Sequence, residues 1–240
     1  FVLAALRERR RPGASACRRV RTGPLDRASP TEPDRVSWRR HLLVLAAFGS
    51  QRLVELGYSA RNERRLRRTD PGAPEAAPSA FKWIVLANAA LFTLPLLEAR
   101  LRGSHRVPSV VARCGWVGAV GAACLRLWVI ATLRGRWTVR ALVPADLSVV
   151  AVGPYRWIRH PNYLALILEF AALPLVGGAY FCAVGLSVLN GALLWRRIWA
   201  EESLLDLHPD YRRQMAGKPR FIPRVCGLAS GQKRHPVARR

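Results

Sequence analysis

Apolar residues are gathered into five long runs along the chain, and short basic pieces separate these runs. The runs cover about residues 41–56, 83–97, 109–133, 163–176 and 179–199. Because a helix needs about 20 apolar residues to cross a bilayer, the pattern predicts an all-α integral membrane bundle with about five transmembrane segments. Gln51, Arg52 and Glu55 interrupt the first run. We therefore expect this run to face a polar interior or to lie partly in the interface.

Small and polar residues inside the runs predict how the helices pack. Gly115, Gly118 and Gly121 recur at a spacing of three, which permits close approach of another helix. Asn88 and Asn190 are expected to face other helices, because an amide is costly against lipid. Residues 176–179 join the last two runs without a charge. They predict a tight helical hairpin that turns at the far membrane face.

The charge distribution narrows the class of protein. The 240 residues carry a formal charge of +24, yet 50% of them are hydrophobic. Apolar runs interrupt the basic stretches, so no continuous cationic face for nucleic acid is predicted. The basic loop 134–159 and the tail from residue 196 are expected on the cytoplasmic side by the positive-inside rule. Five cysteines without a CxxC spacing predict neither a metal site nor a disulfide framework.

Four regions are expected along the chain. Residues 1–36 are rich in Arg, Pro, Ser and Thr, which predicts a basic leader that is disordered or foreign to the working protein. Residues 37–135 are expected to form N-terminal transmembrane helices, residues 136–225 to carry the candidate chemistry described below, and residues 226–240 to form a basic tail. Five membrane crossings with a cytoplasmic C-terminus would place the arginines before residue 40 on the outer side of the membrane. That placement conflicts with the positive-inside rule. Either the first run does not fully cross or the leader does not belong to the protein, and both interpretations stay open.

The segment GPYRWIRHPNYL, residues 153–164, carries the candidate chemistry. Pro161 suits the first turn of a helix, so Arg159 and His160 are expected at a helix N-terminus. Free N–H groups at such an end attract carboxylates and phosphates. Three aromatic residues border the resulting anion pocket: Tyr155, Trp157 and Tyr163. We expect this pocket to bind a metabolite.

Further charged residues are predicted near this pocket. Glu169 shares a helix face with Asn162, and an intramembrane carboxylate usually marks function. A ligand-facing role is therefore favoured over neutralisation by a neighbouring arginine. Arg197 and Glu201 are four residues apart and able to pair, whereas Glu202 points about a third of a turn away.

The C-terminal part of the chain is expected to cover the pocket. Pro219 and Pro223 exclude a continuous helix there. Tyr211 and the element Arg220-Phe221-Ile222-Pro223 are typical of a segment that folds back.

Taken together, these residues resemble the isoprenylcysteine carboxyl methyltransferase family of integral membrane enzymes. The resemblance is carried by G-x-Y-x-x-x-R-H-P-x-Y at residues 153–163, by Arg197, by the Glu201-Glu202 pair, by Tyr211 and by RFIP. The upstream pieces that begin at Arg52 and Leu125 resemble the bacterial branch associated with alkylresorcinol and related phenolic lipids.

The resemblance implies an S-adenosylmethionine-dependent O-methyltransferase in the bacterial inner membrane, with its active site facing the cytoplasm. A lipophilic acceptor, either a prenylcysteine-type carboxylate or a phenolic lipid, would enter from the bilayer. Arg197 and Glu202 match the catalytic positions of the family. The resemblance and the pocket together give eight candidate cofactor contacts: Tyr155, Arg159, His160, Pro161, Tyr163, Glu169, Glu201 and Tyr211. Which of Glu201 and Glu202 faces the pocket stays open.

Two other functions remain at this point. One is an NADPH-dependent membrane reductase related to sterol reductases. This function would be excluded if the purified protein retained S-adenosylhomocysteine and not NADP. The other is a non-catalytic helical membrane protein whose charges only stabilise helix ends.

Overall fold

A computed structural model describes residues 38–102, 107–145 and 148–223. These residues form six α-helices and two short 3₁₀ helices, Arg134–Arg136 and Gly153–Arg156. The α-helices are α1 (Trp38–Thr69), α2 (Pro78–Leu101), α3 (Ser109–Leu133), α4 (Pro161–Val176), α5 (Tyr180–Leu205) and α6 (Pro209–Met215). The described part of the chain has no sheet, only an isolated bridge between Glu75 and Leu142. The all-α prediction is thus confirmed there, whereas the predicted leader and basic tail lie outside the described residues.

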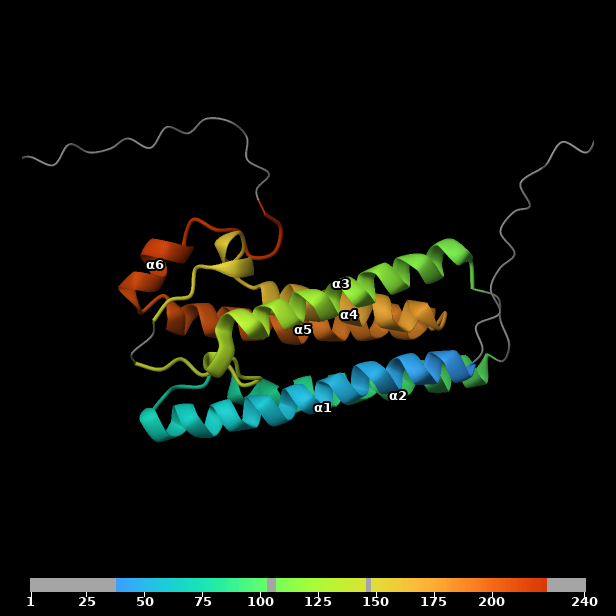
Figure 1. The fold of residues 1–240 in the computed structure, drawn as a ribbon, viewed down its shortest axis with the longest axis horizontal. Coiled ribbons are helices and arrows are strands. Elements are labelled where there is room, and N and C mark those ends of the chain that lie inside the picture. Colours follow the sequence, from blue (N-terminus) through green and yellow to red (C-terminus); the bar gives the residue numbers. More distant parts are fainter. Residues whose placement is uncertain (1–37, 103–106, 146–147, 224–240) are drawn as a thin grey trace, which may run out of the picture. The chain divides into compact units, whose positions relative to one another are not determined.

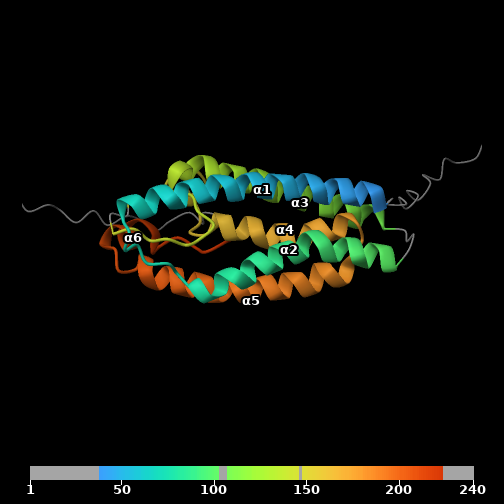
Figure 2. The same cartoon turned by 90° about the horizontal axis from the view of Figure 1, so that it is seen from below.

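The first five helices lie side by side, and α4 is enclosed by the others (Figure 1 and Figure 2). Helix α4 contacts α2, α3 and α5. Its residues Phe170 and Leu173 are completely buried. The short helix α6 lies at the end of the bundle where α4 begins and α5 ends. An apolar central helix of this kind gains most of its stability from packing, not from intrinsic propensity.

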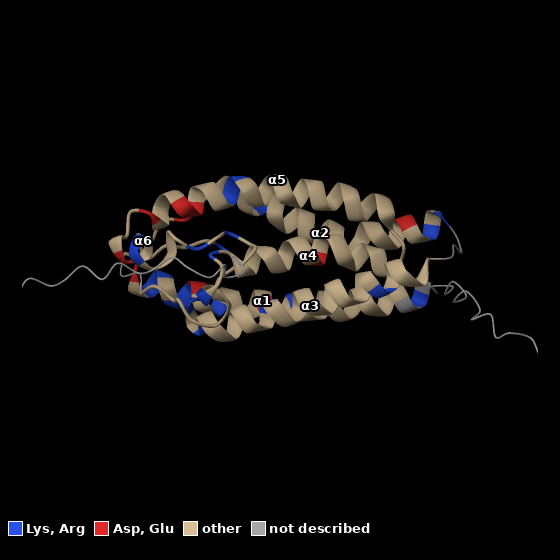
Figure 3. Ribbon diagram, turned by 90° about the horizontal axis from the view of Figure 1, so that it is seen from above, with Lys and Arg blue, Asp and Glu red and all other residues tan. Residues whose placement is uncertain are grey.

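Three of the five expected segments are long and apolar enough to cross a membrane. They are α2, residues 109–136, and α5. Their outer surfaces carry exposed apolar side chains such as Trp83, Val117 and Val188. Figure 3 shows that charged residues gather mainly at the end of the bundle that carries α6. The chain is therefore an integral membrane protein.

Helix α1 is longer than the first apolar run predicts. It continues to Thr69 and includes the basic stretch 61–68, which was expected to be a separating piece. Arginine is a good helix former, so these residues extend the helix. Arg52 and Glu55 of α1 are buried, which agrees with the polar interior, one of the two alternatives left open for this run.

Glycine at two positions of α3 allows the close contact with α4. A Cβ atom at Gly115 would lie 2.9 Å from the backbone nitrogen of Val176, and one at Gly118 would lie 2.7 Å from the Cβ atom of Ala172. Both distances are too short for a side chain, so the predicted close approach is confirmed for these two glycines. Gly121 has open space around it and makes no such contact.

The predicted hairpin between α4 and α5 is also found. Helix α4 ends at Val176 and α5 begins at Tyr180. Gly178, with φ of 70°, supplies the left-handed backbone of the turn. The Glu98 carboxylate of α2 accepts hydrogen bonds from the N–H groups of Phe181 and Cys182, at 3.2 and 2.8 Å. These bonds satisfy backbone donors at the start of α5 that have no partner within the helix.

We predict that Gly115→Ala destabilises the protein by about 1–3 kcal/mol, because its methyl group would overlap the backbone of α4. The matched control Gly121→Ala lies in the same helix with free space around it, so the better helix propensity of alanine should leave stability equal or higher. Thermal unfolding in detergent measures both variants. Equal destabilisation by the two substitutions would contradict the packing described here.

Candidate functional site

The candidate site lies at the α6 end of the bundle, where His160 precedes α4 and Glu202 lies in the last turn of α5. His160 is buried, and its Nε2 atom is 3.0 Å from Oε1 of Glu202. The hairpin therefore brings residues 42 positions apart into direct contact, as the sequence predicted. The His160 ring also stacks on Tyr163 with a centroid distance of 5.4 Å.

Glu202 is the anion around which the site is assembled. Besides His160, its carboxylate binds Nη1 of Arg159 at 3.2 Å and Nη2 of Arg220 at 2.6 Å. The hydrogen bond to Glu202 raises the pKa of the Arg220 guanidinium further. Three cationic or hydrogen-bonding groups from two other segments thus converge on one buried carboxylate.

The segment after α6 folds back over the site, which confirms the prediction made from its prolines. The backbone N–H groups of Arg159 and His160 donate to the carbonyl oxygens of Pro219 and Arg220, at 2.9 and 3.1 Å. These two amides are therefore already occupied and do not contribute to the free N–H groups that were expected to bind an anion at this end of the helix. The side chain of Arg159 remains as the candidate anion ligand.

A cavity of about 460 Å³, here called the polar cavity, opens beside this cluster. Its functional lining residues come from four segments: Tyr155, Arg159, His160, Glu201 and Tyr211. The Nε atom of Arg159 is buried there and has no hydrogen-bond partner among the described residues. Burial, and secondarily the Glu201 charge, raise the pKa values of Tyr155 and Tyr211. Both phenols therefore stay neutral and keep their hydrogen-bond donors.

A second cavity of about 340 Å³, the apolar cavity, is lined by residues of the first five helices. Its walls are mainly apolar, with Ile84, Phe92 and Leu166 among them. Three arginines also line it: Arg52, Arg126 and Arg197. The combination suits a hydrophobic ligand with a polar head.

Tyr163 and Glu201 stand between the two cavities. Tyr163 lines the apolar cavity, Glu201 lines the polar one, and the Tyr163 hydroxyl donates a hydrogen bond to the Glu201 carboxylate. Arg197 lies over the Tyr163 ring, 5.7 Å from its centroid, and donates to the carbonyl oxygen of Val139.

Several predicted contacts are arranged differently. The expected ion pair between Arg197 and Glu201 is not formed. Arg197 donates instead to the carbonyl oxygen of Val139, and Glu201 accepts a hydrogen bond from Tyr163. Glu201 faces the polar cavity, whereas Glu202 is held by Arg159, His160 and Arg220.

Three other expected site residues lie away from the polar cavity. The ligand-facing role favoured for Glu169 is wrong, because its carboxylate pairs with Arg52 and is neutralised there. Trp157 is 48% exposed and packs edge-on against Trp128, so it does not border the pocket. Pro161 is buried in the first turn of α4 and shapes the helix start.

Sequence reasoning missed the roles of two arginines that line the apolar cavity. Arg126 was not singled out within the third run, and Arg52 was expected to face the interior without a role. Trp137 is buried and also lines this cavity, and its carbonyl oxygen accepts a hydrogen bond from the side chain of Asn62 in α1 at 2.8 Å. The charges that interrupt the apolar runs were the available signal for Arg52 and Arg126.

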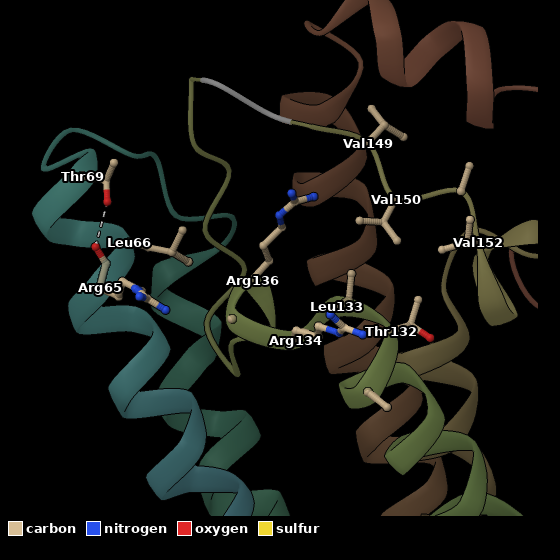
Figure 4. Close-up of a pocket in the computed structure, with 13 residues that line it drawn as sticks. Arg65, Leu66, Thr69, Thr132, Leu133, Arg134, Arg136, Val149, Val150 and Val152 are labelled. Carbon is tan, nitrogen blue, oxygen red and sulfur yellow. Dashed lines mark hydrogen bonds between the residues drawn. The ribbon is translucent and has the colours of Figure 1, made fainter.

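A third, open cavity of about 750 Å³ adjoins the polar cavity (Figure 4). Arg65 of α1 and Arg134 and Arg136 after α3 project around it. It shares wall residues such as Leu133 and Val150 with the polar cavity. It contains none of the residues that the sequence selected as candidate ligands.

Comparison with known proteins assigns this arrangement to a family. Residues 116–207 match the family model described as "Isoprenylcysteine carboxyl methyltransferase (ICMT) family". The chain is also 30% identical over 168 residues to the uncharacterized protein YpbQ of Bacillus subtilis (strain 168), covering 68% of this chain and 95% of that protein. The chain belongs to the isoprenylcysteine carboxyl methyltransferase family. It is therefore an S-adenosylmethionine-dependent methyltransferase.

The polar cavity of this methyltransferase fits S-adenosylmethionine. Its volume lies within the range of about 300–1,000 Å³ that is usual for small-molecule sites. The unpartnered Nε atom of Arg159 suits the carboxylate of the methionine moiety. The Glu201 carboxylate and the faces of Tyr155 and Tyr211 suit a sulfonium cation.

We predict that Glu202→Gln weakens S-adenosylmethionine binding at least about tenfold, because the loss of its charge releases Arg159 and Arg220 from their buried partner. The released C-terminal segment should also be cleaved faster by trypsin after Arg220. Asp210→Asn is the control, since Asp210 pairs with Arg213 on the exposed surface of α6. Unchanged affinity and unchanged cleavage of the Glu202 variant would show that the carboxylate does not organise the site.

Proposed function

We propose that the chain methylates an oxygen atom of a lipophilic acceptor, with S-adenosylmethionine in the polar cavity and the acceptor head in the apolar cavity. The observation that carries this proposal is the boundary between the cavities. Tyr163 and Glu201 are hydrogen-bonded there and line opposite sides. A group that reaches this boundary from one cavity can meet a group from the other.

The residues of the polar cavity bind and orient the cofactor in this proposal. Arg159 holds the carboxylate of the methionine moiety through its free Nε atom. Glu201, Tyr155 and Tyr211 surround the positively charged sulfur atom of the cofactor. The apolar side chains of Leu205 and Met215 pack against its adenine base. When bound, S-adenosylmethionine supplies a methyl group on a positively charged sulfur atom.

Arg197 orients the acceptor oxygen. Its Nε atom is buried in the wall of the apolar cavity and has no hydrogen-bond partner within the described chain. A guanidinium in such apolar surroundings attracts a carboxylate or phenolate strongly and favours the anionic form of a phenol.

The two neighbouring glutamates take different roles. Glu202 is bound by Arg159, His160 and Arg220, so its carboxylate is a poor proton acceptor. It is a positioning residue. Glu201 faces the polar cavity and meets Tyr163, so it is better placed to accept a phenolic proton. This assignment replaces the family-based choice of Glu202 as a catalytic residue.

The membrane orientation follows from charge. Arg65, Arg136 and Arg159 lie at the α6 end of the bundle, together with many of the other basic residues. We infer that this end faces the cytoplasm, where S-adenosylmethionine is made. Helices α1 and α4 complete a five-segment bundle with α2, α3 and α5.

A phenolic lipid of the bacterial branch is the preferred acceptor.

Methyl-transfer assays on the full chain purified in detergent test this function. We expect S-adenosylmethionine to bind, and a long-chain alkylresorcinol to be methylated faster than a prenylcysteine or a quinone-like phenol. Formation of S-adenosylhomocysteine measures the rate with each acceptor. If the cofactor does not bind and none of the three acceptors is methylated, the proposed function is wrong.

Arg197→Ala should lower kcat/KM for the acceptor about 100-fold, because one oxyanion donor is removed. The dissociation constant of S-adenosylmethionine should stay unchanged, since Arg197 does not line the polar cavity. The neighbouring exposed residue provides the matched control Arg196→Ala, with activity near that of the original chain. A loss of cofactor affinity in the Arg197 variant would argue against the assignment of the two cavities.

A further inference from the structure

The open cavity of about 750 Å³ has a wall that carries three arginines and no acidic residue among its described lining. Arg65 comes from α1, and Arg134 and Arg136 come from the 3₁₀ helix that follows α3 (Figure 4). All three residues are exposed, so their charges are accessible from solvent. Three cations around one hollow create a positive potential that attracts an anion.

The three guanidinium groups keep most of their hydrogen-bond donors for a ligand. Each guanidinium has five N–H donors. Arg136 uses Nη1 to bind the carbonyl oxygen of Ser148 at 3.0 Å. The side chains of Arg65 and Arg134 form no ion pair or hydrogen bond with another described residue. Because the forked donors of arginine match phosphate oxygens, a phosphate group suits this wall.

The cavity lies where the headgroups of a membrane are expected. The apolar span that contains α3 ends at Arg136, so two of the three arginines lie at the end of this crossing. Trp128 and Trp157 pack edge-on beside it, with ring centroids 5.7 Å apart, and are 46% and 48% exposed. Exposed tryptophans at the end of a span are typical of the membrane interface. A lipid phosphate can therefore reach the arginines from the bilayer surface.

One side of the cavity is apolar, which favours a lipid over a free phosphate ion. Residues 149–152 form this side and have the sequence VVAV. Val152 is 65% exposed. The glycerol and upper acyl groups of a lipid would cover this surface, whereas a phosphate ion would leave it in water. S-adenosylmethionine is disfavoured here, because its net charge is positive at neutral pH.

The backbone of Arg134 gives an independent indication of a ligand site. Its φ of 50° and ψ of −126° lie in a region that favours glycine and that other residues rarely adopt. Its N–H group donates to the carbonyl oxygen of Ile130, and its carbonyl oxygen accepts a hydrogen bond from Asn62 of α1 at 3.2 Å. The neighbouring structure thus holds an arginine where glycine would fit better. Strain of this kind is concentrated at functional sites.

We propose that the open cavity binds the phosphate group of an anionic membrane lipid. Arg65, Arg134 and Arg136 hold the phosphate oxygens, and residues 149–152 contact the apolar part of the lipid. This lipid is not the methyl acceptor, whose proposed place is the apolar cavity. The bound lipid links α1 to the segments after α3 that form the wall shared by the open and polar cavities.

Two lipids with the same short acyl chains test this site on the full chain in an uncharged detergent. The probes are radiolabelled dioctanoyl phosphatidylglycerol, which is anionic, and dioctanoyl phosphatidylcholine, which has the same phosphate but no net charge. Equilibrium binding should give a dissociation constant at least about tenfold lower for the anionic lipid, as expected for hydrogen bonds between charged groups. Inorganic phosphate at the same concentration should not displace it.

Arg65→Gln should weaken binding of phosphatidylglycerol about tenfold, because one arginine of the site is lost. Arg64→Gln is the matched control and should change the affinity less than about twofold. Arg64 is the adjacent exposed residue of α1 and does not line the cavity. Both substitutions remove one positive charge from the same basic stretch, so general attraction of the surface for anionic lipid changes equally.

Arg134→Gly separates lipid binding from stability. The affinity for phosphatidylglycerol should fall about tenfold, since a guanidinium is removed. The melting temperature in detergent without added lipid should stay equal or rise, because glycine adopts this backbone conformation at the end of a helix without strain. A lower melting temperature together with unchanged lipid affinity would show that Arg134 serves the fold and has no place in the site.

The other outcomes are equally decisive. Equal binding of the two lipids, or equal weakening by Arg64→Gln and Arg65→Gln, overturns the site in favour of a general attraction between a basic surface and anionic lipid. Displacement by inorganic phosphate overturns the lipid as ligand and assigns the cavity to a soluble phosphate. Lipid binding is measured without S-adenosylmethionine, so each result is independent of the proposed methyl transfer.

Discussion

The contact of Glu202 with Arg159, His160 and Arg220 is the interaction on which the site depends. It joins the end of α5, the segment before α4 and the segment after α6. A carboxylate that is only 6% exposed is stable as an anion only when cations and hydrogen-bond donors compensate it. Each partner is in turn fixed by the same contact. The polar cavity is therefore shaped by an electrostatic constraint at the end of the bundle.

Packing of the apolar helices makes that contact possible. The glycines of α3 let α4 approach closely, and the hairpin at residues 177–179 returns the chain so that α5 ends beside the start of α4. The same arrangement places Tyr163 and Glu201 between the polar cavity and the apolar cavity. A soluble cofactor enters from water, whereas a lipophilic substrate enters from the bilayer. Two adjoining cavities allow one enzyme to bind both molecules at the same time.

Hydrophobic patterning predicted the helices, the hairpin and the close packing at Gly115 because these features depend on local sequence and on small residues. The predicted ion pair between Arg197 and Glu201 was wrong because two side chains at this spacing on one helix gain only about 0.2–0.5 kcal/mol from pairing. Hydrogen bonds to Val139 and Tyr163 from other segments outweigh that gain. The roles of Arg52 and Arg126 escaped prediction because their shared partner Glu55 becomes visible only when α1 and α3 are placed together. Likewise, Glu169 has a buried partner from a helix more than 100 residues earlier.

An experimental structure with S-adenosylhomocysteine and an alkylresorcinol tests the central assignment most directly. We expect the cofactor product in the polar cavity, with its carboxylate at Arg159 and its sulfur atom facing the Tyr163–Glu201 boundary, and the lipid head in the apolar cavity beside Arg197. Binding of the cofactor product in the open cavity around Arg65 and Arg134, or of both ligands on one side of Tyr163, would contradict the account.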